Sequence, residues 1–555
     1  MTAGVRQQPR DAGRPRPRRA ARLGLVGWLT GLTLLTGIGY RLWLLAHATP
    51  PTNSDEATMG LAALHIARGE GFPVWFYGQQ YMGTLEAYLA APIFALAGGP
   101  SLLGLRLPTL ALYAVFLLLA WRLTLRLTGD RWFGLLVVAL LALGSDRVVK
   151  NQLIAGGGYP EMNVAGVALA LLAVDLAAGR PQRRLARWAA WGFLSGLMLW
   201  VDPLVLPYVL ATGAVLVGFR HRELRGRAGA LLGSAAVLGA APLLAHSLLT
   251  GRNPLHAVLA AGGADASAGW ADRLHGGLLL GPPLGMGFCD PGSCASWQLW
   301  WALALPVLLA LAAATAWRAL RRPSNAPADP APRAAAAMRL VLVLAAAATL
   351  AAYTLSSASG LTPVESSRYL SCLLISLPAL LWPVWTTARR GAGGTTARLG
   401  AGSPVARRGR GLGWTVARPV ALVVLVATLG TAAHATWRAT QTAPATRAAE
   451  ARHAELVSTL RQLGVRHVQA GYWTCNRLTF ASAEDVVCAV VDDTLRPGFD
   501  RYPAYRREVE RATVPAWVAP TGSPLAARLD EQLRAAPGSL DVLTTDGWRI
   551  YLPRA

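Results

Sequence analysis

Residues 23–46 read LGLVGWLTGLTLLTGIGYRLWLLA, an apolar run long enough to cross a hydrocarbon core about 30 Å thick. The 22 residues before it contain seven Arg and three Pro and cannot form a core. A cleavable signal peptide has an apolar stretch of only about 7–15 residues. We therefore predict a retained first membrane helix, preceded by a basic cytoplasmic tail at residues 1–22.

Apolar runs continue along the chain. Hydrophobic residues make up 53% of the 555 residues and charged residues 15%, whereas soluble domains carry about 25% charged residues. A single water-soluble globule is therefore excluded, and so is a largely disordered chain. Further spans are predicted at 107–125, 132–146, 163–179, 188–201, 204–219, 228–249, 298–317, 338–355, 369–388 and 419–437. The predicted fold is a polytopic α-helical membrane protein with about 11 transmembrane helices.

The net charge of +24 raises the question of nucleic acid binding. The basic residues, however, form short clusters between apolar runs. The six segments that would face the cytoplasm hold 28 Arg, whereas the longer loops on the other side hold seven cations. This asymmetry predicts an integral plasma membrane protein with a cytoplasmic N-terminus. The lipid bilayer is its predicted partner, and binding of nucleic acid is not expected.

The transmembrane domain is expected at 23–437, with long outer loops at 47–106 and 250–297. Within the first loop, Tyr88–Gly98 is predicted as a helix lying against the outer surface rather than a further span. In the second loop, Cys289 and Cys294 flank a turn on an oxidising face and are predicted to form a disulfide, with two free thiols as the alternative. Residues 438–555 alternate helical and strand-like segments, which indicates an extracytoplasmic α/β domain. Cys475 and Cys488 are a second candidate pair within it.

The first outer loop carries the strongest candidate site. Asn53-Ser-Asp55-Glu56 follows the first span directly, where adjacent carboxylates are costly unless they are solvated or used. The run from Trp75 to Tyr88 combines aromatic rings, amides and a carboxylate, as carbohydrate sites do; its candidate ligands are Tyr77, Gln80 and Glu86. An interfacial aromatic belt beside a solvated acidic loop is the alternative.

Later outer segments add further candidates. Lys150 is the only lysine of the chain, and Gly156-Gly-Gly158 permits close backbone approach. Asp202 stands at the outer edge of two spans, with helix capping as its alternative role. Arg368 has the guanidinium fork that matches phosphate, with pairing to Glu365 as the alternative. The remaining candidates beside these are Tyr159, Glu161 and Tyr369.

The sequence lacks the motifs that are typical of several classes of enzyme. The sequence contains no Walker loop, HExxH, paired CxxC or GxSxG, and its nine His show no metal-ligand spacing. ATP hydrolysis, zinc proteolysis and serine hydrolysis are therefore not expected. No cofactor is predicted to be required, although a divalent cation stays open.

These motifs together resemble those of the C-type (GT-C) superfamily of membrane glycosyltransferases, in the branch of protein O-mannosyltransferases and lipid A aminoarabinose transferases. The resemblance rests on four stretches: Ser54-Asp-Glu-Ala57, Tyr77-Gly-Gln-Gln-Tyr-Met-Gly-Thr-Leu-Glu86, Leu105-Arg106-Leu-Pro108 and Glu365-Ser-Ser-Arg368-Tyr369. It implies a sugar donor carried on polyprenyl phosphate and transfer to a glycan, protein or lipid acceptor on the outer face.

The resemblance also implies residue roles. Asp55 matches the catalytic general base and Glu56 its motif neighbour. Glu161 lies where the family keeps an acidic residue, usually Asp. Arg368 falls where the family binds the lipid phosphate, and Lys150 or Arg106 are further candidates to stabilise its charge. The implied reaction is an inverting single displacement.

Two other classes of protein remain as alternatives. A transporter or lipid flippase predicts inverted repeats and carboxylates at mid-span, and the sequence shows neither clearly. A catalytically inactive, glycan-binding relative is the second alternative, which the intact Asp55-Glu56 pair disfavours.

Overall fold

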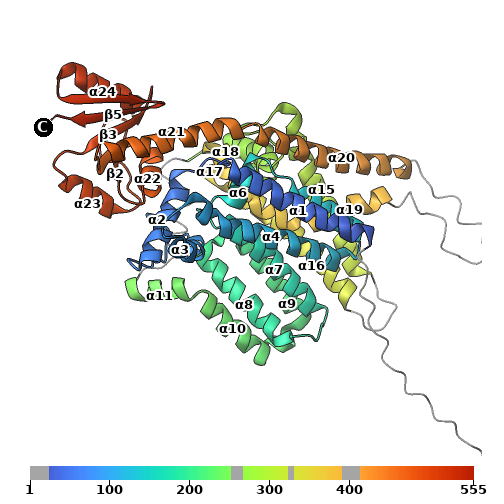
Figure 1. Cartoon of the computed structure of the whole chain (residues 1–555). Coiled ribbons are helices and arrows are strands. Elements are labelled where there is room, and N and C mark those ends of the chain that lie inside the picture. The colour runs from blue at the N-terminus through green and yellow to red at the C-terminus, as the bar shows by residue number, and fades with distance from the viewer. Residues whose placement is uncertain (1–23, 252–266, 323–329, 390–412, 555) are drawn as a thin grey trace, which may run out of the picture.

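The computed structural model describes residues 24–251, 267–322, 330–389 and 413–554. Within these ranges the chain forms a bundle of long helices with a small sheet domain at one end (Figure 1). The long helices are α1 (Leu25–Ala46), α4 (Leu102–Thr128), α7 (Tyr159–Ala177), α8 (Arg184–Val201), α9 (Leu206–Leu224), α15 (Trp300–Arg321), α16 (Ala331–Leu355), α19 (Leu377–Arg389) and α20 (Gly413–Thr440).

Two bent helix pairs complete the set of apolar segments. They are α5 (Arg131–Ala142) with α6 (Asp146–Leu153), bent by 89°, and α10 (Arg227–Gly239) with α11 (Ala241–Thr250), bent by 61°. Eight segments of the described residues are long and apolar enough to cross a membrane, or up to ten if each pair is one span. The chain is therefore a polytopic membrane protein. The remaining predicted span, 188–201, is α8, which begins with two Arg in its first turn and falls outside this set.

Two short helices follow α1, namely α2 (Ser54–Arg68) and α3 (Leu85–Ala97). Helix α2 begins at Ser54 because the Asn53 side chain accepts a hydrogen bond from the Glu56 N–H at 2.8 Å, and it ends at Gly69, whose φ is +72°. Asp55 therefore stands in the first turn, where the helix dipole favours an anion. Helix α3 has 13 residues, fewer than a spanning helix needs.

Short elements connect the long helices. They are η1 (Pro203–Val205), α13 (Trp270–Leu274), η2 (His275–Leu280), α14 (Gly281–Gly285), η3 (Ser296–Leu299), α17 (Ser357–Leu361), α18 (Pro363–Ser366) and η4 (Ser367–Ser376). A disulfide joins Cys289 to Cys294 between α14 and η3.

The C-terminal domain, residues 443–554, is an α/β unit. Its sheet has the strand order β2-β1-β3-β5-β4, in which β1 is parallel to β2 and β3, and β5 is antiparallel to β3 and β4. A disulfide joins Cys475 to Cys488. Its elements are α21 (Ala443–Gln462), β1 (His467–Ala470), α22 (Tyr472–Ala481), β2 (Val487–Val490), α23 (Pro503–Arg511), β3 (Ala516–Pro520), α24 (Pro524–Ala535), β4 (Leu540–Thr545) and β5 (Trp548–Pro553).

This domain packs on α2 and α3. One hydrophobic cluster combines side chains of both helices with Phe480 and Val487 of the domain, and Figure 1 shows α22 and α23 beside α2. The contact is close, since a Cβ added at Gly60 would lie 2.4 Å from the Phe480 ring. The C-terminal domain is therefore held against the beginning of the first inter-span segment.

Candidate functional site

A cavity of about 220 Å³ lies where α2, the α3 approach, the N-terminus of α7 and the start of η4 meet. Its polar and aromatic walls come from segments far apart in the sequence. Five of the predicted site residues line it: Asp55, Tyr159, Asp202, Arg368 and Tyr369. The other residues that line it are Phe76, Gln79, Tyr81, Met82, Gly156, Gly157, Pro203 and Leu204.

Asp55 is held by two residues of the C-terminal domain. The Tyr472 hydroxyl donates to its Oδ1 at 2.6 Å, and Arg501 Nη2 donates to the same oxygen at 2.7 Å. Arg501 Nε also donates to the Tyr472 hydroxyl at 2.7 Å. Among the described residues no group donates a hydrogen bond to Oδ2 of Asp55. The carboxylate is thus fixed through one oxygen, which leaves the other for a substrate proton.

Arg501 is itself enclosed by aromatic rings. Its guanidinium carbon lies 4.7 Å from the centre of the Phe76 ring and 5.5 Å from that of Phe499. Its side chain is 6% exposed. A desolvated, hydrogen-bonded ion pair of this kind holds its geometry firmly.

Arg368 supplies the unpaired positive charge of the cavity. Among the described residues it has no ion-pair partner, and its Nε is buried without a hydrogen-bond partner. The guanidinium lies 5.6 Å from the centre of the Tyr369 ring. Glu365, its alternative partner in the sequence, forms no ion pair with it in the structure. A half-buried guanidinium without a counter-ion favours an anionic ligand.

The glycine triplet lies in the segment between α6 and α7, beside Asp55 of α2. Gly156 has a φ of +141°, and a Cβ added there would lie 3.4 Å from the backbone carbonyl of Asp55. Gly158 has a φ of +65° and caps the N-terminus of α7. These backbone conformations favour glycine, so the triplet shapes the cavity wall beside Asp55.

Glu86 and Glu161 lie together behind this wall. Both are 3% exposed, and neither carboxyl group has a hydrogen-bond partner of normal geometry among the described residues. Burial and the neighbouring Glu161 raise the pKa of Glu86 well above its ordinary value. Two buried carboxyl groups in contact disfavour double ionisation, which favours the protonated form of Glu86.

Asp202 caps α8 and faces the cavity. Its Oδ1 accepts a hydrogen bond from the Leu204 N–H at 2.8 Å. Burial raises the pKa of Asp202 to about 7, although the Leu204 hydrogen bond and the charge of Arg368 act in the opposite direction. Asp202 is therefore a group in the cavity that changes its charge near neutral pH.

We expect Asp202→Asn to remove a pH dependence of stability. The native state keeps a proton that the unfolded chain releases between the ordinary pKa of 3.8 and about 7, so the wild type loses stability as pH rises through this window. The variant has no such proton at this position, so its melting temperature should fall less steeply than that of the wild type over this window. Thermal unfolding in detergent from pH 4 to 8 measures this, with the exposed Asp493→Asn as control. A wild-type slope retained in Asp202→Asn would contradict the assignment.

Glu56 and Arg106, both predicted to act on substrate, bind each other. Arg106 Nε donates to Glu56 Oε1 at 2.7 Å and Nη2 to Oε2 at 2.6 Å. The two side chains are 0% and 1% exposed, respectively, and neither lines the cavity. A third hydrogen bond joins Arg106 Nη1 to the carbonyl of Pro50 at 2.9 Å. The Glu56–Arg106 ion pair joins α2 to α4 next to Asp55.

The structure brings three other predicted ligands to different places. Lys150 Nζ forms an ion pair with Asp146 Oδ2 at 2.8 Å, one turn away on α6. The Tyr77 hydroxyl lies 2.7 Å from His65 Nδ1, and its ring packs against Tyr502 at 4.8 Å between centres. Gln80 does not line the cavity, whereas its neighbour Gln79 does. Tyr77 thus belongs to the contact between α2 and the C-terminal domain.

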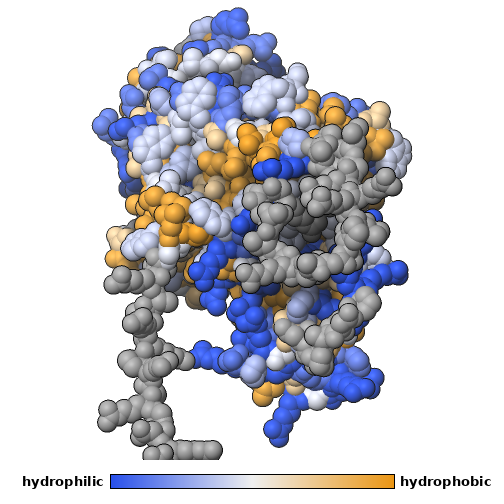
Figure 2. Space-filling model, turned by 90° about the vertical axis from the view of Figure 1, so that its right-hand side faces the viewer, coloured by the Kyte–Doolittle hydropathy of each residue, from blue (hydrophilic) through white to orange (hydrophobic). Residues whose placement is uncertain are grey.

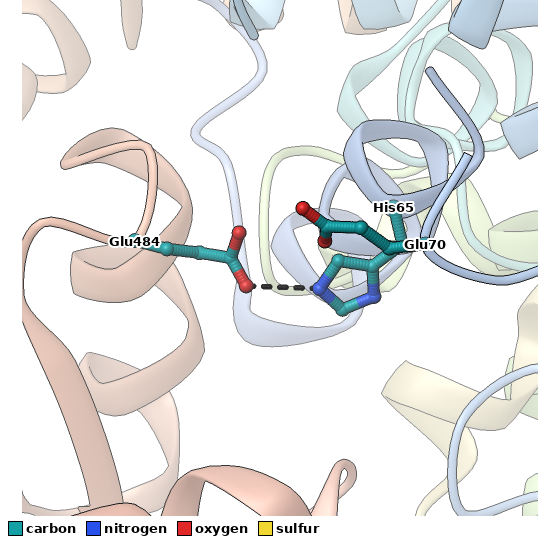
Figure 3. A group of neighbouring side chains, drawn as sticks. All are labelled: His65, Glu70 and Glu484. Atoms are coloured by element: carbon teal, nitrogen blue, oxygen red, sulfur yellow. Dashed lines mark hydrogen bonds and ion pairs between the residues drawn. The ribbon is translucent and has the colours of Figure 1, made fainter. Parts of the chain in front are cut away.

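The same contact contains a group of metal-ligand type. Side-chain atoms of His65, Glu70 and Glu484 lie within 4.8 Å of one another (Figure 3). His65 Nε2 is 2.9 Å from Glu484 Oε1, the Tyr505 hydroxyl donates to that oxygen at 2.6 Å, and Arg68 pairs with Glu484 Oε2. The charge of Arg68 in this group opposes a cation. We therefore interpret this network as hydrogen bonds that hold the C-terminal domain against α2.

Two residues of the site could not be assigned from the sequence. Tyr472 and Arg501 lie in the C-terminal domain, and their contacts with Asp55 span 417 and 446 residues. A local pattern carries no signal for such a distant partner. An Arg between aromatic residues, in Gly498-Phe-Asp-Arg501-Tyr, is the only local hint.

No family model matches the sequence, and no curated protein matches it significantly. Solved structures do match in fold. One is ArnT from Cupriavidus metallidurans bound to undecaprenyl phosphate, with 14% identity, a TM-score of 0.57, and coverage of 96% of this chain and 98% of that chain. Another is the oligosaccharyltransferase of Archaeoglobus fulgidus in its apo form, with 13% identity, a TM-score of 0.50, and coverage of 96% and 74%.

The chain has the GT-C fold. The likeness extends over nearly the whole length of ArnT, including the C-terminal domain. In this fold, Asp55 and Arg368 share one cavity, and the C-terminal domain holds Asp55 from outside the cavity lining through Tyr472 and Arg501.

Proposed function

We propose that this GT-C chain transfers a sugar from a polyprenyl-phosphate donor to a hydroxyl or amine acceptor. The observation that carries the proposal is the cavity in which a carboxylate with one free oxygen, Asp55, accompanies an unpaired guanidinium, Arg368. These are the two charges that a displacement at a sugar–phosphate bond requires.

An apolar groove next to the cavity fits the lipid part of such a donor. It has a volume of about 610 Å³, runs between α9 and α16, and shares Pro203, Leu204 and Tyr369 with the cavity. A prenyl chain in this groove would bring its phosphate to Arg368. The undecaprenyl phosphate in the ArnT structure is consistent with a ligand of this kind.

The reaction follows from these positions. Asp55 Oδ2 removes the proton of the acceptor as its oxygen or nitrogen bonds to the anomeric carbon. The bond from that carbon to the phosphate oxygen breaks, and its electron pair leaves with the phosphate. Arg368 stabilises the negative charge that develops there. Attack opposite the leaving phosphate inverts the anomeric centre.

We further propose that the cavity faces the outside of the cell. The distribution of Arg favours a cytoplasmic N-terminus and an extracytoplasmic C-terminal domain. A lipid-linked donor then supplies activated sugar where no nucleotide sugar is present. None of the proposed steps uses a metal ion; the acceptor, whether glycan, protein or lipid, stays open.

Arg368→Gln is expected to weaken binding of undecaprenyl phosphate by roughly 10-fold to 100-fold, because a hydrogen bond to a charged group contributes about 1.5–3 kcal/mol. Titration of the purified full chain in detergent measures this. Arg131→Gln, an exposed substitution at the start of α5, is the matched control and should bind as the wild type does. Equal affinity of Arg368→Gln and wild type would remove the phosphate role, and no binding by the wild type would refute the lipid donor.

Arg501→Gln is expected to lower the rate of transfer by about 10-fold or more, because Asp55 loses a charge-assisted hydrogen bond that fixes its position. Donor affinity should change little, since Arg501 does not line the cavity. Arg501→Lys should restore part of the rate. A rate unchanged in Arg501→Gln, or a loss confined to donor affinity, would show that the contact does not position the base.

A further inference from the structure

A second cavity, of about 380 Å³, lies between α15, α16 and α19. Its place is the opposite end of the bundle from Asp55. Arg368 lines the first cavity and Thr387 the second, and both lie on the continuous segment formed by η4 and α19. The rise per residue of these helices places the two residues about 30 Å apart. Figure 2 views the molecule from this end, where hydrophilic residues gather beside hydrophobic ones.

Among the described residues, three guanidinium groups line this cavity and no carboxylate does. They belong to Arg318 and Arg322 at the end of α15 and to Arg339 of α16. Among the described residues none of the three has an ion-pair partner; the hydrogen bond that Arg339 makes is to the backbone carbonyl of Leu127. Within the described residues, therefore, no carboxylate balances the positive charge of this cavity.

The rest of the wall is apolar. Leu311, Ala312 and Ala316 of α15 face Ala379 and Trp382 of α19 across it. The threonines of the lining, which include Thr386 and Thr387, donate their hydroxyl protons to backbone carbonyls. Recognition of a polar ligand therefore depends on the three Arg. A cavity with three Arg side chains beside an apolar wall fits an amphiphile with an anionic headgroup.

We infer that this cavity binds the phosphate headgroup of an anionic membrane lipid, in the leaflet opposite the proposed site of transfer. Guanidinium forks match phosphate oxygens, and basic pockets between spanning helices are suited to anionic headgroups. Leu311, which lines the cavity and is 41% exposed, gives the acyl chains a surface to lie on. The inference is independent of the proposed sugar transfer.

The test is retention of lipid by the purified full chain, measured by native mass spectrometry after equal additions of phosphatidylglycerol and phosphatidylcholine. The wild type should retain phosphatidylglycerol at least 10-fold better. Arg318→Gln with Arg339→Gln should reduce this preference to about twofold or less. Arg321→Gln is the matched control, because Arg321 lies on the same helix end but stacks on Trp317 outside the cavity.

A second variant guards against misfolding. Arg318→Gln with Arg322→Gln alters only exposed side chains and should also lower the preference, while undecaprenyl phosphate binding at the other end stays as in the wild type. Equal retention of both lipids by the wild type, or equal losses in Arg321→Gln and the cavity variants, would overturn the inference. Displacement of phosphatidylglycerol by micromolar inorganic phosphate would assign the cavity to a free anion and would overturn the lipid.

Discussion

Asp55→Asn is expected to abolish sugar transfer while the protein still inserts and binds undecaprenyl phosphate. Asn has the shape of Asp and can keep the hydrogen bond from Tyr472, but it cannot take up a proton. General base catalysis by a positioned side chain contributes about 10²–10⁴-fold, and the loss should be of this order. The measurement is mass spectrometry of surface glycans in a strain that lacks the chain, complemented with wild type or variant.

The control for this variant is Asp546→Asn, an exposed change in the turn between β4 and β5 that should complement fully. Intact donor binding by Asp55→Asn separates a failed proton transfer from a misfolded site. Transfer at the wild-type rate would show that Asp55 is not the base, whether or not the protein uses a lipid-linked donor.

Arg106→Ala is expected to destabilise the protein by about 3–5 kcal/mol, because it leaves the Glu56 carboxylate buried without its partner. Loss of expression or a sharply lower melting temperature in detergent would report this. Replacement of both residues, Glu56→Gln with Arg106→Gln, removes the two charges together and should recover most of the loss. A double-mutant cycle of Glu56→Gln, Arg106→Gln and both changes together isolates their coupling.

The same experiment distinguishes the two roles of Arg106. The sequence motif predicts a substrate ligand, whereas the structure encloses the side chain between Glu56 and Pro50. An Arg106→Ala protein as stable as the wild type but deficient in donor binding would favour the motif. An unstable protein that is rescued by the double change would favour the pair.

The sequence was sufficient for the elements that depend on local patterns. Apolar runs predicted most of the long helices, because a spanning helix must be apolar over its length. The position of Asp55 directly after the first span predicted its place at the bundle end, and Arg368 stands in the same cavity. Both residues follow or precede long apolar segments whose ends fix their depth.

Contacts between distant segments were beyond such patterns. Arg501 and Tyr472 reach Asp55 only because the C-terminal domain packs on α2, where Phe480 fits against Gly60. Likewise, Arg106 reads as a loop cation beside a proline, and its pairing with Glu56 depends on how α4 crosses α2. Bends such as the 89° turn after α5 also escape hydropathy, which registers composition and not direction.

The contact of Arg501 with Asp55 has a consequence for biogenesis. A nascent chain that stops after α21 and before residue 501 contains every candidate membrane span but lacks the Arg501 contact with Asp55, so the proposed site is incomplete. The proposed transfer would then begin only after the last part of the polypeptide has folded, so partly synthesised molecules would be inactive in the membrane.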